Sequence, residues 1–91
     1  MTFEFDENKS SINKSKHGID FVEAQELWED PYSFEIASLQ SEDEERYLVL
    51  GHIGTKHFTA IITYREDKIR IISVRRSREK EIQLYESIRA R

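Results

Sequence analysis

The chain has 91 residues, with one proline, three glycines and no cysteine. This length suits one small domain, and we treat residues 1–91 as a single domain. The missing cysteines exclude disulfide frameworks and thiolate metal sites, and no apolar run approaches the roughly 20 residues of a membrane span. The start of the chain also lacks a basic region followed by an apolar one, so we expect a cytoplasmic protein without membrane association.

The charge is distributed unevenly along the chain, although the net charge is only −4. Residues 1–50 carry 13 acidic and 4 basic side chains, whereas residues 51–91 carry 5 acidic and 10 basic ones. Such asymmetry indicates a polyanion-facing surface in the second half, and two ordinary solvated faces are the alternative. At 35% charged and 37% hydrophobic residues, the core is thin and the surface heavily ionised.

The N-terminal segment predicts a short strand and a helix. The alternation in Phe3 to Phe5 is typical of a strand, and Asp6 can cap the helix that follows. This helix should end near His17, because Gly18 can adopt the left-handed conformation of a helix C-cap. Its body has almost no apolar side, so we expect it to depend on contacts around Ile12.

A second helix is predicted between Asp20 and Asp30-Pro31. Asp20 and Glu23 form a capping-box pattern, and Asp30-Pro31 ends the helix. Four positions at helical spacing are apolar: Phe21, Ala24, Leu27 and Trp28. Residues 32–38 then predict an edge strand or an extended loop, and Gln40 to Glu45 carry no core signal.

Three stronger strand patterns follow, over residues 46–52, 58–65 and 68–75. Glu66-Asp67 is short enough for a tight hairpin, and Gly51 and Gly54 flank the preceding turn. The strand over 68–75 has apolar residues of both parities, so we expect a central strand covered on both faces.

A final helix is predicted after Ser77, which can cap it. Ile82, Tyr85 and Ile88 form its apolar stripe. We therefore expect an α+β fold, with an antiparallel sheet of three to four strands on which two N-terminal helices and one C-terminal helix pack.

Several kinds of site are disfavoured. The spacing of His17, His52 and His57 without cysteine matches no zinc site. No glycine-rich phosphate loop, nucleophile elbow or HEXXH pair occurs. We therefore expect neither a metal nor a cofactor.

The remaining chemistry is that of cations around a phosphate. RNA is cleaved without a metal if a base takes the 2′-hydroxyl proton, cations stabilise the phosphorane and an acid protonates the leaving oxygen. The segment Lys16-His17-Gly18 and the stretch from Arg65 to Arg78 could form two halves of one such site. Arg75 and Arg76 have opposite parity on their strand, so only one of them can point into a given cleft.

Each of these residues also has a structural explanation. Arginines at strand ends are commonly solvated or paired at the rim. His17 could be a cation beside a helix C-terminus, and Tyr85 could be a core residue with its hydroxyl at the surface.

The order of several motifs resembles the BrnT family of type II toxins. The motifs are Lys16-His17-Gly18, Glu44-Glu45-Arg46-Tyr47 and Arg70-Ile71-Ile72-Ser73-x-Arg75, with Glu81 and Tyr85 after them. The chain departs from the pattern at Gln40-Ser41-Glu42, where many relatives have His-Ser-Glu, and at Val74, where they have alanine.

The resemblance implies a RelE-like fold and a ribonuclease that blocks translation. It also implies neutralisation by a cognate BrnA-like antitoxin with a DNA-binding domain, so that DNA is contacted only through the antitoxin. The residues it implies for catalysis are His17, Arg46, Arg75, Lys16 and Arg65. We also expect Lys14, Arg76, Arg78 and Tyr85 to bind RNA, with Glu81 in support. Of these residues, the resemblance covers Tyr85 and Glu81.

Our hypothesis is a metal-independent endoribonuclease. Arg75 and Arg46 would stabilise the phosphate, His17 would act as base or acid, and Lys16 would anchor the backbone. The alternative is a non-catalytic module whose basic face holds a protein partner or nucleic acid. The hypothesis that the chain itself binds DNA has less support, because no helix has a dense basic face suited to the major groove.

Overall fold

Five strands form one mixed sheet in the computed structural model, which describes residues 2–38 and 45–91. The strands are β1 (Thr2–Glu4), β2 (Phe34–Ala37), β3 (Tyr47–Ile53), β4 (Lys56–Arg65) and β5 (Lys68–Arg76). The helices are α1 (Glu7–His17), the 3₁₀ helix η1 (Glu23–Glu29) and α2 (Glu79–Arg89). The fold is α+β as expected, but the prediction of a purely antiparallel sheet with three to four strands was wrong.

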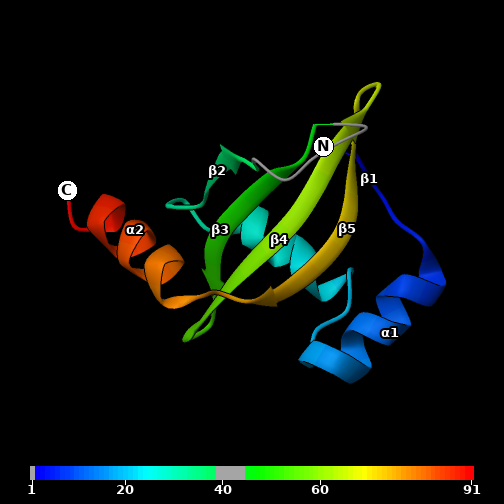
Figure 1. The fold of residues 1–91 in the computed structure, drawn as a ribbon, viewed down its shortest axis with the longest axis horizontal. Coiled ribbons are helices and arrows are strands. Elements are labelled where there is room, and N and C mark those ends of the chain that lie inside the picture. The colour runs from blue at the N-terminus through cyan, green and yellow to red at the C-terminus, as the bar shows by residue number, and fades with distance from the viewer. Residues whose placement is uncertain (1, 39–44) are drawn as a thin grey trace.

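The sheet has the order β1-β5-β4-β3-β2, so β4 lies in the middle (Figure 1). Strands β2 to β5 form the expected antiparallel meander, whereas β1 pairs parallel to β5. An ion pair between Glu4 and Arg70, at 2.9 Å, joins β1 to β5. The N-terminal strand thus makes β5 an inner strand, although not the central one.

A β-bulge interrupts the pairing of β4 with β5. Ile62 faces Ile71 and Ile61 faces Ser73, so Ile72 is an extra residue in β5. Side chains alternate between the two faces of a strand. One extra residue therefore places every later side chain on the face opposite to the one it would otherwise occupy. The apolar residues of both parities in β5 therefore reflect a bulge, and not the coverage of both faces that the sequence suggested.

The turns follow the predicted chemistry, apart from one glycine. Glu66, in the tight β4–β5 hairpin, has φ of 58°, and Gly54, in the β3–β4 turn, has φ of 63°. Gly51 is not a turn residue but lies inside β3. A Cβ atom there would lie 3.1 Å from both Asp30 Oδ2 and Leu27 Cδ2, so glycine permits the close packing of η1 on the sheet.

Helix α1 has the predicted caps but a different anchor. Asp6 accepts hydrogen bonds from the N–H groups of the first turn, and Gly18 ends the helix with φ of 76°. Ile12, however, is 57% exposed, while Ser10 and Asn13 are buried. The expected dependence on Ile12 was therefore wrong, and polar side chains hold this helix in place.

Asn13 is the main link between α1 and the sheet. Its amide donates to the carbonyls of Ile19 (2.8 Å) and Val74 (2.9 Å) and accepts from the N–H of Val74 (3.2 Å). It thus pairs with the edge of β5 just beyond the residues that β1 covers. A side-chain amide can replace a neighbouring strand there because it offers both a donor and an acceptor.

The segment after Asp20 is a 3₁₀ helix and not the predicted α-helix, although its capping box is present. Asp20 Oδ1 accepts from the N–H of Glu23 (2.7 Å), and Glu23 Oε1 accepts from the N–H of Asp20 (2.9 Å). The buried residues recur at every third position: Phe21, Ala24, Leu27 and Asp30. Three residues per turn align these positions on one side, which explains the tighter helix.

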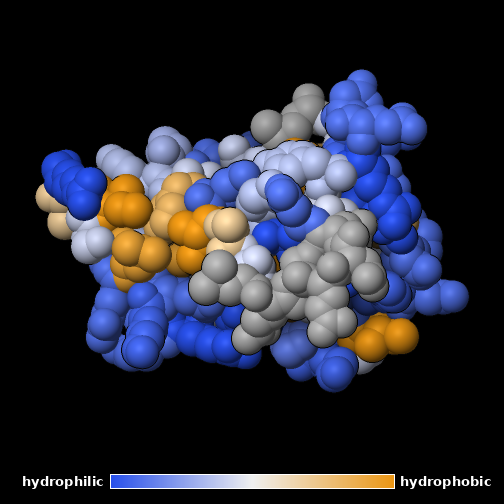
Figure 2. Space-filling view, turned by 45° about the horizontal axis from the view of Figure 1, so that its top comes forward, coloured by the Kyte–Doolittle hydropathy of each residue, from blue (hydrophilic) through white to orange (hydrophobic). Residues whose placement is uncertain are grey.

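Helix α2 lies at the opposite end of the sheet from α1 (Figure 1). Its N-cap is Arg78 and not the predicted Ser77, whose hydroxyl instead lies 2.8 Å from that of Thr59. Tyr85 is buried, as the apolar stripe predicted. In Figure 2, exposed apolar side chains gather toward the end of the molecule where α2 lies. None of the helices in residues 2–38 and 45–91 is long and apolar enough to span a membrane.

We predict that Asn13→Ala lowers the free energy of unfolding by about 2–4 kcal/mol, because it leaves buried backbone groups of Ile19 and Val74 without partners. Ile12→Ala, one residue away on the exposed side, is the matched control and should change stability by less than about 0.5 kcal/mol. Urea unfolding followed by circular dichroism measures both. Equal losses in the two variants would contradict this account of α1.

Candidate functional site

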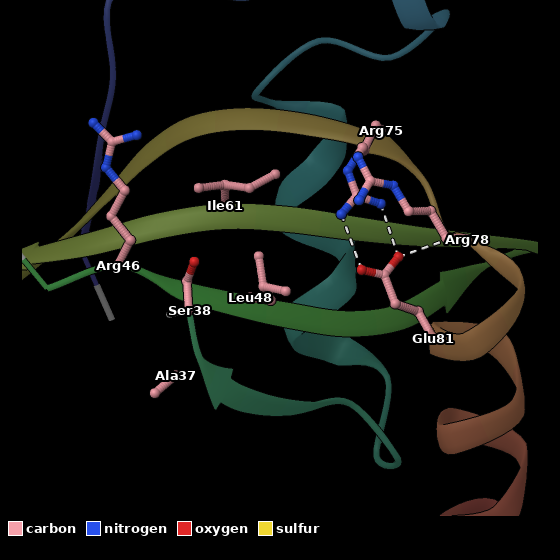
Figure 3. A pocket seen from close by; sticks show the side chains of 8 residues that line it. All are labelled: Ala37, Ser38, Arg46, Leu48, Ile61, Arg75, Arg78 and Glu81. Carbon is pink, nitrogen blue, oxygen red and sulfur yellow. Dashed lines mark hydrogen bonds and ion pairs between the residues drawn. The ribbon is translucent and has the colours of Figure 1, made fainter. Parts of the chain in front are cut away.

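A cleft opens on the face of the sheet opposite η1 (Figure 3). It has a volume of about 440 Å³, and we call it the arginine cleft. Its lining residues are Ala37, Ser38, Arg46, Leu48, Ile61, Arg75, Arg78 and Glu81. They come from the ends of β2 and β5, the start of β3, the middle of β4 and the start of α2, with Arg46 just before β3.

The bulge in β5 determines that Arg75 faces this cleft. Val74 is fully buried in the core that contains η1, so Arg75 points to the other face. Without the extra residue at Ile72, Arg75 would have the parity of Ile69 and Ile71, which lie in the core. A guanidinium there would be buried without room or partner.

Glu81 holds Arg75 in a bidentate ion pair. Arg75 Nη1 and Nη2 lie 2.7 and 2.9 Å from Glu81 Oε1 and Oε2. Glu81 Oε1 also accepts from the Thr59 hydroxyl (3.0 Å) and the N–H of Arg78 (2.8 Å). The Arg75 side chain is therefore fixed from the sheet and from the first turn of α2 at once.

These contacts keep Glu81 ionised. The hydrogen bonds from Arg75 are the largest cause, burial opposes them, and the Arg78 N–H and the Thr59 hydroxyl add to them, so that the pKa of Glu81 falls to about 2. The carboxylate stays charged at any physiological pH. Among the described residues that line the cleft, three carry a guanidinium group and one a carboxylate, and this excess of positive charge favours anions.

Arg75 keeps donors for a ligand despite this pairing. Glu81 occupies the two terminal nitrogens, and Nη1 also donates to the carbonyl of Arg76 (3.3 Å). A guanidinium has five N–H groups. The edge formed by Nε and the second hydrogen of Nη2 has no partner within the described part of the chain and matches two oxygens of a phosphate.

The two halves of the predicted site do not share this cleft. Lys16 and His17 are exposed at the end of α1, and no residue of α1 lines the cleft. Arg76 has the parity opposite to Arg75, and its guanidinium lies 5.7 Å from the centre of the Phe58 ring. Phe58 and Gly18 line another, smaller hollow, so Arg76 is the arginine nearer to the Lys16-His17 corner.

Three other predicted residues have different surroundings. Lys14 pairs with Glu23 at 2.8 Å and ties α1 to η1. Arg65 is exposed at the end of β4 and does not line the cleft. Tyr85 is 1% exposed and donates its hydroxyl to Asp30 at 2.7 Å, so it is not accessible to RNA in this structure, and we no longer assign it to binding.

Sequence reasoning missed the residues that support and line the cleft. Thr59 binds Glu81, and Leu48 and Ile61 form the floor. The alternation of side chains along β3 and β4 could have identified them, because it places all three on the face opposite the core. His57 was missed too: its Nε2 lies 2.8 Å from Glu86 Oε2, and this contact lowers the pKa of Glu86 and docks α2 on the sheet.

The fold and the cleft define a small α+β protein with a groove lined by arginines. Residues 5–81 match the family model described as the ribonuclease toxin, BrnT, of a type II toxin-antitoxin system. The chain belongs to this family of ribonuclease toxins, and the type II system implies a cognate antitoxin as a partner. No curated protein matches the chain significantly.

We predict that the Glu81 pairing makes stability depend on pH in acid. The ordinary pKa of the carboxyl is 4.5 and the pKa in the folded protein is about 2, so the stabilisation is complete above pH 4.5 and is lost as the pH falls toward 2. In the wild type, the free energy of unfolding should fall by up to about 3 kcal/mol over this range because of Glu81, and Glu81→Gln should remove this part of the fall.

Unfolding curves between pH 2 and pH 7 measure the effect. Glu79→Gln, an exposed glutamate of the same helical turn, is the control and should follow the wild type. If Glu81→Gln follows the wild type as well, the ion pair does not stabilise the fold.

Proposed function

We propose that this protein is a metal-independent endoribonuclease and that RNA is cleaved in the arginine cleft. The observation that carries the proposal is the convergence of Arg46, Arg75 and Arg78 on one groove, with Arg75 held by Glu81. Membership of a ribonuclease toxin family agrees with this assignment. We also propose that the α+β fold is RelE-like.

The reaction we propose is attack of a ribose 2′-oxygen on the adjacent phosphorus. The 2′-hydroxyl loses its proton to water, the bond from phosphorus to the 5′-oxygen breaks, and the leaving oxygen takes a proton from water, which gives a 2′,3′-cyclic phosphate and a 5′-hydroxyl. Negative charge builds on the phosphorane oxygens in the transition state, and positioned guanidinium groups stabilise that charge. Arg75 suits this role because it is fixed before the substrate arrives and retains an unoccupied bidentate edge.

Charge stabilisation, and not a matched acid–base pair, would then supply most of the rate enhancement. Among the described residues that line the cleft, Glu81 has the only carboxyl group, and with a pKa of about 2 it is a weak base. We assign Glu81 to positioning Arg75. His17 lies outside the cleft, so the proposal gives its imidazole no proton-transfer role.

Membership of the family supports a proposal for the biological role. We propose that cleavage of RNA in the cytoplasm inhibits translation, that a cognate BrnA-like antitoxin neutralises the toxin, and that DNA is bound only through the DNA-binding domain of the antitoxin. Obstruction of the arginine cleft would be sufficient for neutralisation, since RNA needs access to Arg46 and Arg75.

We predict that Arg75→Ala lowers the rate of RNA cleavage by about 10²-fold or more, because it removes the main group that stabilises the phosphorane. Arg75→Lys should not restore the rate, since an ammonium group cannot replace the planar fork. Arg46→Ala should also impair cleavage. The measurement is cleavage of a labelled RNA by purified protein, together with growth after induced expression.

Two controls make the experiment specific. Lys68→Ala removes an exposed cation from the same strand and should leave cleavage unchanged. EDTA should have no effect, and a 2′-O-methyl group at the cleaved position should abolish cleavage. Full activity of folded Arg75→Ala and Arg46→Ala variants would overturn the site.

His17→Ala separates the present site from the one expected from the sequence. Retained cleavage agrees with the arginine cleft, whereas a loss as large as that of Arg75→Ala would return the α1 corner to the active site. If the wild-type protein binds RNA or its partner without cutting RNA or arresting growth, the non-catalytic binding module is the correct function.

A further inference from the structure

The floor of the arginine cleft is apolar. Leu48 and Ile61 face each other across β3 and β4, and both are half-buried and line the cleft. Paired positions on neighbouring strands have Cβ atoms about 5 Å apart, so the two side chains form one continuous patch. The core covers the other face of the sheet, and α2 docks on this face farther along, through Tyr85 near His52 and His57.

Cations stand on both sides of this floor. Arg46 precedes Leu48 by two residues, and Arg75 faces Thr59, which precedes Ile61 by two residues. The two arginines are therefore separated by about 13 Å along the strands, since each residue contributes about 3.3 Å. In Figure 3, Arg46 lies on one side of Leu48 and Ile61, and Arg75 and Arg78 lie on the other.

We propose that Leu48 and Ile61 form the platform for one RNA base, and that the arginines at its two ends hold the phosphates on either side of that nucleotide. This inference rests on the proposed function, because it names the subsite in which the cleaved RNA is read. Enzymes that act on nucleic acids hold unstacked bases against aromatic or apolar side chains. No aromatic residue lines this cleft, so in the described chain the aliphatic pair is the surface available for a base.

The charges favour a nucleotide over an apolar side chain of a protein partner. An apolar side chain would offer no anionic group to Arg46 or to the Nε edge of Arg75, and polar groups left unpaired at an interface cost affinity. A nucleotide places its anionic groups at the ends and its apolar face in the middle. The volume of about 440 Å³ lies within the range of small-ligand sites, about 300–1,000 Å³.

Abasic scanning of the substrate tests the platform. After the cleaved position is mapped, an oligoribonucleotide of that sequence carries a 2′-O-methyl group there to block cleavage, and an abasic site is moved along it. One abasic position should weaken binding to the wild-type protein about fivefold, less than for most aromatic platforms. Absence of any such position would overturn the inference without the use of a variant.

Variants then identify the platform residues. In Leu48→Thr and Ile61→Thr, the penalty of that abasic site should fall below about twofold, while the dependence of binding on salt stays that of the wild type, because the phosphate contacts remain. Ile53→Thr, at a half-buried β3 residue that does not line the cleft, should keep the full penalty. An unchanged penalty in both platform variants would overturn the inference.

The same assay separates this inference from the proposed function. If Arg46→Ala and Arg75→Ala bind the oligonucleotide with wild-type affinity and salt dependence, the cleft is not the RNA site and both proposals fail. If the arginine variants fail while the platform variants behave as wild type, only the platform is wrong. Platform variants that bind RNA normally but escape neutralisation by the antitoxin would show that the floor contacts a protein.

Discussion

The bulge at Ile72 is the constraint on which the site depends. It lets β5 bury Ile69 and Ile71 before the extra residue and Val74 after it, and it turns Arg75 to the opposite face. Asn13 holds the strand in this register, because its amide binds both backbone groups of Val74. Packing on one face and charge on the other are therefore consequences of one extra residue.

Buried polar side chains join the elements of this thin-cored fold. Besides Asn13, Asp30 accepts from the backbone N–H groups of Tyr32 and His52 and from the Tyr85 hydroxyl. Burial opposes its ionisation, but these donors outweigh burial and hold the pKa of Asp30 below its usual value. Hydrogen bonds are directional, so they restrict the orientations of α1, η1 and α2 on the sheet more than apolar contacts do.

Local signals were sufficient for much of the fold. Some features are determined by interactions between residues close in sequence, and the sequence predicted each of them. They are the caps Asp6 and Gly18, the hairpin at Glu66-Asp67 and the three long strands. The pairing of β1 with β5 and the bulge at Ile72 depend on partners far along the chain. For the same reason Arg46 and Arg75 were predicted from their chemistry and the family resemblance, while their separation from His17 required the faces of the sheet to be known.

The parallel pairing of β1 with β5 also affects the order of folding. The meander from β2 to β5 joins neighbours in sequence, whereas β1 and α1 bind a strand more than 60 residues later, through Glu4–Arg70 and Asn13–Val74. Contacts with such long separations carry a high loop-closure cost. These contacts can form only after β5 has been synthesised. A nascent chain without β5 therefore lacks both the strand that carries Arg75 and the backbone groups of Val74 that anchor α1.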